Sequence, residues 1–169
     1  MANAGINVPN RSVTAITATD FAQVVDINLN GVMNGVPAVL PQMRERGTGT
    51  LILTSSWAGR HRSRLTGPAY RASKHAVVAL SHSINQDQGV NEIHCTALTP
   101  VEVATPIIQS RPKPPSDEDL GRMLQADDLR AMVRYISEAP PHVCINEVLI
   151  SPTWNRSFLG VSELGRIKL

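Results

Sequence analysis

Short β-rich segments alternate with longer helical patterns along the chain, and this alternation restricts the fold more than any single residue does. The expected strands are residues 49–54, 92–98 and 143–150. The expected helices are residues 17–46, 70–88, a short helix opening at 116–119, and 127–138. Strands joined by helices of about ten or more residues run parallel, with right-handed crossovers. We therefore predict an α/β fold with a parallel sheet covered by helices.

The first helical segment carries signals at both ends and two prolines inside. Thr17 and Asp20 have the hydroxyl-x-x-acid spacing of an N-terminal cap, and Gly47 can end the helix. Pro37 and Pro41 each lack a backbone donor, and a proline inside a helix usually bends it. We predict one long, bent helix over residues 17–46.

Composition argues against several classes of protein. The chain has 169 residues, enough for one domain with a core, and a net charge of +2 with scattered basic residues. That distribution argues against a nucleic-acid partner, and no apolar run reaches the roughly 18 residues of a membrane span. The first residues lack the charged and apolar regions of a signal peptide, so we expect a cytoplasmic protein.

The cysteines and histidines give no metal-binding pattern. Cys95 and Cys144 each lie in an apolar strand-like run without C-x-x-C spacing. We expect both to be buried free thiols, with a disulfide or a ligand role as the weaker alternative. The five histidines form no H-x-x-x-H or H-E-x-x-H pattern, so we predict no metal ligand.

Tyr70 and Lys74 form the pair of residues with the clearest chemistry. Four residues apart on a helix, they lie on one face and can act on the same small volume. Tyrosine has an unperturbed pKa near 10, too high for a base at neutral pH, and a neighbouring ammonium favours the phenolate. A lowering of the pKa by about three units would correspond to roughly 4 kcal/mol. An ordinary exposed helical pair is the alternative.

Five segments, taken in order, resemble those of a known family. They are Asn3-Ala4-Gly5, Asn28-Leu29-Asn30-Gly31, Ser55-Ser56-Trp57-Ala58-Gly59, Tyr70 to Lys74, and Pro100 to Pro106. Together they resemble the C-terminal two-thirds of a short-chain dehydrogenase/reductase, an NAD(P)-dependent oxidoreductase of Rossmann type. The resemblance covers residues 1–153 and leaves 154–169 as an irregular tail. It implies a partial, doubly wound Rossmann-type parallel sheet with flanking helices, its N-terminal strands missing.

The resemblance also implies catalytic roles. Tyr70 would be the general acid/base, and Lys74 would lower the Tyr70 pKa and bind the nicotinamide ribose. Ser56 would donate a hydrogen bond to the substrate oxygen. We prefer it to Ser55 because of its spacing to the glycine that ends its segment. Asn28 would hold a water in a proton relay, or it would only bridge backbone groups of a bent helix.

The implied cofactor is NAD or NADP, with the choice between them not predicted. The residues that would bind it are Asn3, Ala4, Gly5, Tyr70, Lys74, Pro100, Val103 and Thr105. Two features depart from the family. No segment matches the T-G-x-x-x-G-x-G turn that holds the pyrophosphate, and Val101 stands where the family has a glycine. A β-branched residue disfavours a positive φ and narrows the space beside the nicotinamide.

Some of these residues have simpler explanations. Ser56 could be an ordinary hydroxyl at a strand end, and Thr105 could cap a turn. Arg60, His61 and Arg62 could contact phosphate or substrate, but a solvated loop is the better prediction for them.

Two functions from different classes follow. The first is an NAD(P)-dependent oxidoreductase that acts on a small secondary alcohol or ketone. The alternative is a truncated, non-catalytic remnant that self-associates and binds no cofactor alone. Either would form a homo-oligomer through the long helices that carry Asn28 and Tyr70, and a bare sheet edge would favour that association. The substrate itself is not predicted.

Overall fold

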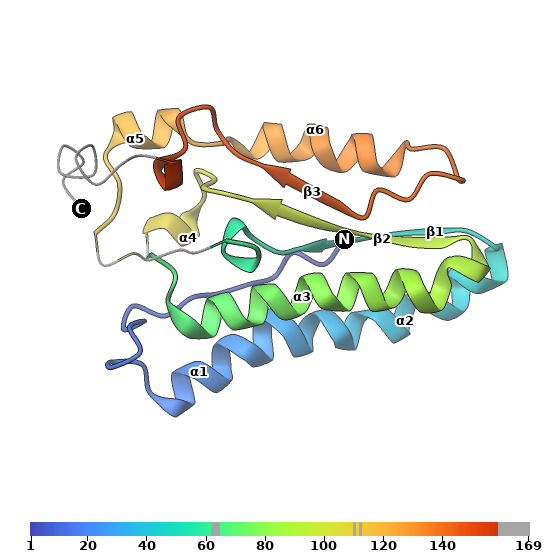
Figure 1. Ribbon diagram of the computed structural model, residues 1–169, viewed down its shortest axis with the longest axis horizontal. Coiled ribbons are helices and arrows are strands. Elements are labelled where there is room, and N and C mark those ends of the chain that lie inside the picture. The colour runs from blue at the N-terminus through green and yellow to red at the C-terminus, as the bar shows by residue number, and fades with distance from the viewer. Residues whose placement is uncertain (62–64, 110, 112, 159–169) are drawn as a thin grey trace.

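The predicted α/β fold is confirmed by the computed structural model, which describes residues 1–61, 65–109, 111 and 113–158. One parallel sheet has the strand order β1-β2-β3. The strands are β1 (Gly49–Thr54), β2 (Ile93–Pro100) and β3 (Glu147–Ile150). The α-helices are α1 (Ala18–Val25), α2 (Gly31–Arg46), α3 (Gly67–Gln88), α4 (Pro106–Gln109), α5 (Asp117–Arg122) and α6 (Ala126–Ser137). In Figure 1, α1, α2 and α3 cover one side of the sheet and α5 and α6 lie on the other.

The first long helix starts and ends as predicted but changes its hydrogen bonding at an unexpected place. The Thr17 side chain accepts a bond from the Asp20 amide (3.0 Å), and Gly47 ends α2 in the left-handed region with φ of 63°. A π-helical turn, Asp26–Asn30, joins α1 to α2, whereas both prolines lie inside α2. Such a turn inserts an extra residue into the helix and often marks a functional site.

The third predicted strand is too long. Pairing with β2 begins only at Glu147, which stands opposite Ala97. Just before it, the Ile145 carbonyl accepts a hydrogen bond from the Thr96 hydroxyl (2.6 Å). The backbone amide and carbonyl of Cys95, which would make the preceding ladder bonds, are bonded instead to the Asn85 side chain. Cys144 lies in this irregular segment and is exposed, so the prediction that it is buried is wrong.

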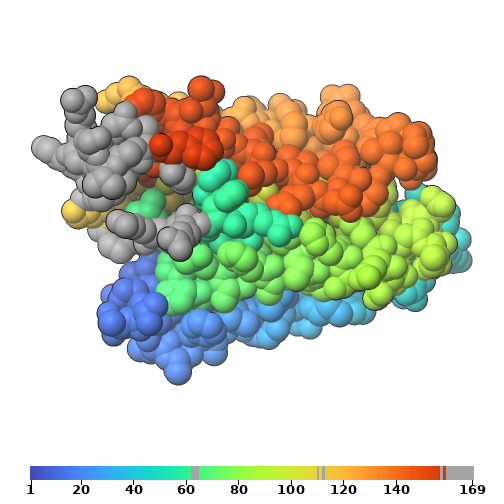
Figure 2. All heavy atoms as spheres, viewed as in Figure 1, coloured from blue at the N-terminus to red at the C-terminus, as the bar shows by residue number. Residues whose placement is uncertain are grey.

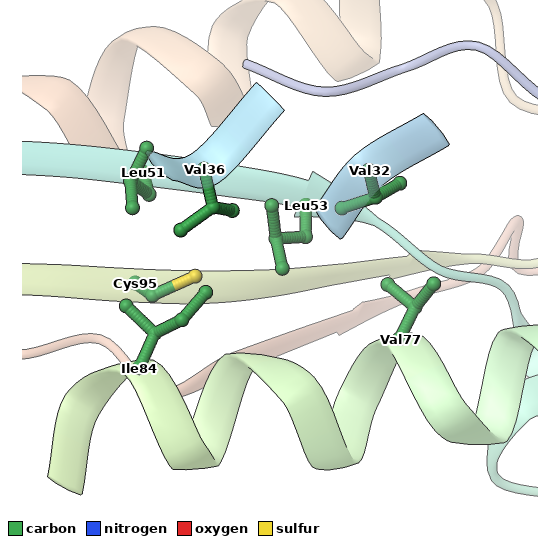
Figure 3. Packing of buried hydrophobic residues seen from close by; sticks show 7 residues of the cluster. All are labelled: Val32, Val36, Leu51, Leu53, Val77, Ile84 and Cys95. Atoms are coloured by element: carbon green, nitrogen blue, oxygen red, sulfur yellow. The ribbon is translucent and has the colours of Figure 1, made fainter. Parts of the chain in front are cut away.

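The core between the sheet and the long helices follows the alternation of side chains along a strand. Leu51 and Leu53 point to the same face as the buried free thiol Cys95, and valine and isoleucine side chains of α2 and α3 pack on them (Figure 3). Ile52, one residue out of phase, packs with Leu98 and with Ile136 of α6 on the opposite face. Both faces of the sheet are thus covered, as expected of parallel strands.

The N-terminal residues lie along the outer edge of β1. The Ala2 amide donates to the Ile52 carbonyl (2.8 Å), and the Ala2 carbonyl accepts from the Thr54 amide (2.9 Å). Within the described residues this single parallel bridge is all that pairs with that edge. It brings the following residues, Asn3 to Gly5, to the carboxyl end of β1. Across the described part of the chain, the helices are all too short or too polar to span a membrane.

Candidate active site

A cavity of about 620 Å³ opens at the carboxyl ends of β1 and β2. In open α/β sheets this edge is where ligands bind. Most of the residues singled out from the sequence line it, namely Asn3, Gly5, Ser56, Tyr70, Lys74, Pro100, Val103 and Thr105. Ala4 and Asn28 do not appear in the cavity wall. Segments from four parts of the chain therefore meet at one hollow.

Lys74 is held deep beneath the cavity by its helix position and one strong hydrogen bond. Its side chain is 3% exposed, and Nζ donates to the Thr54 carbonyl at the end of β1 (2.7 Å). Nζ also lies 5.6 Å from the centre of the Tyr70 ring. Burial lowers the pKa of Lys74 from 10.5 to about 8. The group can therefore gain or lose a proton near neutral pH.

The pKa of Tyr70 is raised, not lowered, and the sequence-based expectation is wrong on this point. Burial is the largest cause and favours the neutral phenol. A hydrogen bond with Ser56 and the charge of Arg111 act in the opposite direction and are smaller. Lys74, whose Nζ is bonded to the Thr54 carbonyl, does not contribute to this shift of the Tyr70 pKa.

The two serines at the end of β1 have different partners. The Ser55 hydroxyl donates to the Lys74 carbonyl (2.7 Å), which joins the strand to α3. The Ser56 hydroxyl accepts a weak bond from the Ala58 amide (3.3 Å) and interacts with the Tyr70 side chain. Gly59 makes this packing possible, since a Cβ there would lie 2.5 Å from the Ser55 hydroxyl. Of the two serines, only Ser56 affects the pKa of Tyr70.

Asn28 is a buried bridge between three segments. Its Oδ1 accepts from the Ile6 amide (2.7 Å), and its Nδ2 donates to the Ile6 carbonyl (3.0 Å) and to the Ser73 hydroxyl (3.2 Å). The π-helical turn points this side chain inward, and it is fully buried. A Cβ at Gly5 would lie 3.3 Å from both Asn28 Oδ1 and Lys74 Nζ, so the chain passes closely over both groups. These bonds join Asn28 to the N-terminal segment and to α3, not to backbone groups of its own bent helix, and the water relay stays a prediction.

The segment after β2 forms another wall of the cavity. Val103 and Thr105 line it, and the Thr105 hydroxyl donates a weak bond to the Val103 carbonyl (3.3 Å). Among the described non-glycine residues only Glu92 has a positive φ, so Val101 needs no strained backbone. Its side chain nevertheless lines the cavity and takes up space that a glycine would leave open.

Sequence reasoning missed an ion-pair cluster behind this wall. Arg156 grips Glu102 with two bonds (Nε to Oε2 and Nη2 to Oε1, each 2.7 Å), and Arg111 Nη1 donates to the same carboxylate. Burial pushes the pKa of Glu102 upward, but the bonds from Arg156 and Arg111 outweigh it and lower the pKa. These residues are far apart in sequence and share no spacing pattern, so nothing in the sequence indicated the cluster.

The basic segment that follows Gly59 makes surface contacts. Arg60 forms a two-pronged ion pair with Glu147 of β3 (2.6 and 2.9 Å), and the His61 ring lies 4.0 Å from that of Trp57. Figure 2 shows the teal segment around residues 57–61 at the surface, between green α3 and the orange chain near β3. Arg60 and His61 thus contact the protein itself, while Arg62 lies outside the described residues.

The parallel sheet with helices on both faces is a Rossmann-type fold, and comparison with known proteins identifies the family. The family model described as short chain dehydrogenase matches residues 1–115. The chain belongs to the short-chain dehydrogenase family.

Individual relatives are similar over about two thirds of the chain or more. An uncharacterized oxidoreductase of Listeria monocytogenes is 30% identical over 159 residues, covering 89% of this chain and 63% of the relative. Levodione reductase of Leifsonia aquatica is 36% identical over 111 residues, covering 66% of this chain and 41% of the relative. The chain thus spans less than two thirds of the length of these relatives.

Solved structures resemble the fold over most of the chain. The crystal structure of levodione reductase matches with a TM-score of 0.78 and 28% identity, covering 89% of this chain and 63% of that one. The crystal structure of serine dehydrogenase from Escherichia coli matches with a TM-score of 0.75 and 26% identity, covering 89% and 62%. Both matches cover 89% of this chain.

Proposed function

We propose that this protein is an NAD(P)-dependent oxidoreductase that interconverts a small secondary alcohol and its ketone. The observation that carries the proposal is the grouping of Tyr70, Lys74 and Ser56 on one cavity, with the Ser56 hydroxyl close enough to the Tyr70 phenol to favour its phenolate. A phenol and a hydroxyl side by side can both hydrogen-bond one substrate oxygen. In the proposed reaction Tyr70 exchanges a proton with that oxygen and Ser56 donates to it.

The raised pKa of Tyr70 suits it to the direction of reduction. Its hydroxyl stays protonated at neutral pH and can donate to a carbonyl that gains negative charge. In the direction of oxidation Tyr70 would act as the base, and its phenolate would take the hydroxyl proton of the alcohol. Lys74, with a pKa of about 8, can carry a positive charge nearby at neutral pH and stabilise that phenolate.

The cavity fits the nicotinamide and ribose end of the cofactor, which when bound would give or take the hydride. Lys74 and Tyr70 would contact the ribose, and Thr105 with the backbone near Val103 would hold the carboxamide. Asn3, Gly5 and the strand end Pro100 would form the remaining walls, where the missing side chain of Gly5 leaves room above Lys74. Ala4, between them, lies outside the cavity wall, and a contact with the cofactor stays a prediction for it. The sequence offers no glycine-rich turn for the pyrophosphate, so we derive no contact for that group.

Relatives use both forms of the cofactor, and the proposal covers both. One relative, 29% identical, is 2-dehydro-3-deoxy-L-rhamnonate dehydrogenase (NAD(+)). A similar solved structure, with a TM-score of 0.78 and 25% identity, is the closed form of serine dehydrogenase complexed with NADP+.

We propose that copies of the chain associate through α2 and α3. These helices lie side by side along one side of the molecule (Figure 1), and Met33 of α2 is 45% exposed there. The cytoplasmic location and the lack of a nucleic-acid partner stay predictions.

The test compares the only two tyrosines of the chain. NADH and NADPH are titrated into the 169-residue chain and followed by nicotinamide fluorescence and thermal shift, and turnover is then measured with a panel of small ketones. Tyr70→Phe should lower turnover by about 10²- to 10⁴-fold, the usual contribution of a general acid or base. Tyr135→Phe is the matched control, because Tyr135 is 64% exposed and outside the cavity.

Two results would overturn the proposal for this chain. The first is the absence of any fluorescence or thermal response to either cofactor at millimolar concentration, which would support the non-catalytic alternative. The second is cofactor-dependent turnover that Tyr70→Phe and Tyr135→Phe leave equally intact. Loss of turnover in Tyr70→Phe alone would support the role of Tyr70.

A further inference from the structure

The charged side chains that line the cavity all have the same sign. Arg11, Lys74, Arg111 and Arg130 belong to its wall, and among the described residues no aspartate or glutamate does. Lys74 is accounted for by the proposed chemistry, and Arg130 is paired on the surface with Asp127 (3.0 Å). Arg11 and Arg111 have no part in the proposed hydride transfer. Their positive charge would attract an anionic ligand to this part of the cavity.

Arg111 is fixed in the wall by the cluster behind it. Its side chain is 14% exposed, and its Nη1 donates a hydrogen bond to Glu102. The same carboxylate also accepts two hydrogen bonds from Arg156. A guanidinium has several N–H donors in a planar fork, and this bond uses one of them. The cluster thus orients the guanidinium without using all its donors. Asp119, 4.0 Å from Arg156 and not part of the cavity wall, offsets the charge of the second arginine.

Arg111 also acts on the reacting end of the site. The positive charge of Arg111 lowers the pKa of Tyr70 and so favours its phenolate. Both side chains line the same cavity, so a small ligand bonded to Tyr70 lies within the field of Arg111. A substrate bearing a negative charge would be attracted to this end of the cavity, and its reacting oxygen would face Tyr70.

Arg11 brings a second guanidinium to the same region. It is fixed by bonds from Nε to the Val8 carbonyl (2.8 Å) and from Nη1 to the Leu65 carbonyl (3.2 Å). Burial lowers its pKa, and the like charge of Arg111 lowers it further. Two arginines that repel each other across a cavity are stabilised when an anion binds between them. The sequence separates them by 100 positions, and only the fold brings them together.

We propose that the alcohol or ketone taken by this site carries a carboxylate, which Arg111 and Arg11 bind while the reacting oxygen lies at Tyr70 and Ser56. This inference rests on the proposed function, since it names the class of substrate for that site. A planar carboxylate matches the fork of a guanidinium, as the two bonds between Arg156 and Glu102 already illustrate. Arg111 is a specificity-determining residue in this proposal and takes no part in proton transfer.

The test uses two ketones of nearly the same shape that differ in charge, levulinate and its amide levulinamide. Binding of each to the 169-residue chain is measured by calorimetry, with no cofactor present. Levulinate should bind at least about tenfold more tightly than the amide, the size of a charge-assisted bond. Arg111→Gln should bring the two affinities to within about threefold of each other, and Arg111→Lys should keep much of the preference because it keeps the charge.

The matched control is Arg134→Gln, which removes the same charge from an exposed helical ion pair outside the cavity. It should leave the preference for levulinate unchanged. Circular dichroism of each variant shows whether it is folded, and Arg111→Lys keeps the test decisive if Arg111→Gln unfolds. Equal affinity of the wild-type chain for the two ketones, or no binding of either, would overturn the proposal. So would a preference that survives in folded Arg111→Gln.

Failure of this inference and failure of the proposed function give different results. Preferential levulinate binding without any cofactor-dependent turnover would leave the carboxylate site in place and overturn the oxidoreductase activity. Turnover of neutral ketones that depends on Tyr70, with no preference for levulinate, would support the oxidoreductase activity and overturn the carboxylate site.

Discussion

The buried ammonium of Lys74 makes the stability of this protein depend on alkaline pH in a specific way. Burial lowers the pKa of Lys74 from 10.5 to about 8, so between these values the folded chain holds fewer protons on this group than the unfolded chain does. The free energy of unfolding must then rise with pH across this window. At ~1.36 kcal/mol per pKa unit, the gain from Lys74 amounts to about 3 kcal/mol.

Lys74→Met removes the titrating group and keeps most of the side-chain volume. Urea denaturation of both proteins at several pH values from 8 to 10.5 gives the difference in their free energies of unfolding. This difference should move in favour of the wild type by about 3 kcal/mol as the pH rises, while the cysteine and tyrosine contributions cancel. Lys113→Met, which changes an exposed lysine, should track the wild type. A difference between wild type and Lys74→Met that stays constant over this range would refute the reasoning.

Three other substitutions test the packing and the charges around the site. Gly59→Ala should lower the free energy of unfolding by about 1–3 kcal/mol in urea, because its Cβ would lie 2.6 Å from the Lys74 carbonyl oxygen; wild-type stability would contradict this close packing. Asn28→Leu should cost about 2–4 kcal/mol, since Ile6 loses hydrogen bonds at both its amide and its carbonyl, and unchanged thermal melting would argue against that bridge. Glu102→Gln should make the free energy of unfolding fall less steeply as the pH is lowered through the acid range. The Glu102 carboxylate has a pKa below 4.5 in the folded chain, so it contributes stability that is lost as the pH falls. Acid titrations that coincide with those of the wild type would contradict this role.

Local signals in the sequence determined the class of fold and the centre of the site. The strand pattern at 49–54 matches β1 residue for residue, because a buried strand bounded by glycine and polar residues needs no distant information. Tyr70 and Lys74 meet at the cavity because four positions along a helix always share a face. Thr17 and Gly47 mark helix ends through interactions within a single turn, and these predictions were confirmed.

The tertiary structure decided what depends on burial and on residues far apart in the sequence. The pKa of Tyr70 moves upward because desolvation outweighs its neighbours, and desolvation is a property of the packed chain. Cys144 is exposed although its sequence segment is apolar, since strand pairing begins only after it. Arg11 and Arg111 share a cavity because the crossover connections return both segments to the carboxyl edge of the sheet. Spacing within the sequence can identify residues that share one helix or strand, but electrostatics between distant segments is fixed only when the chain has folded.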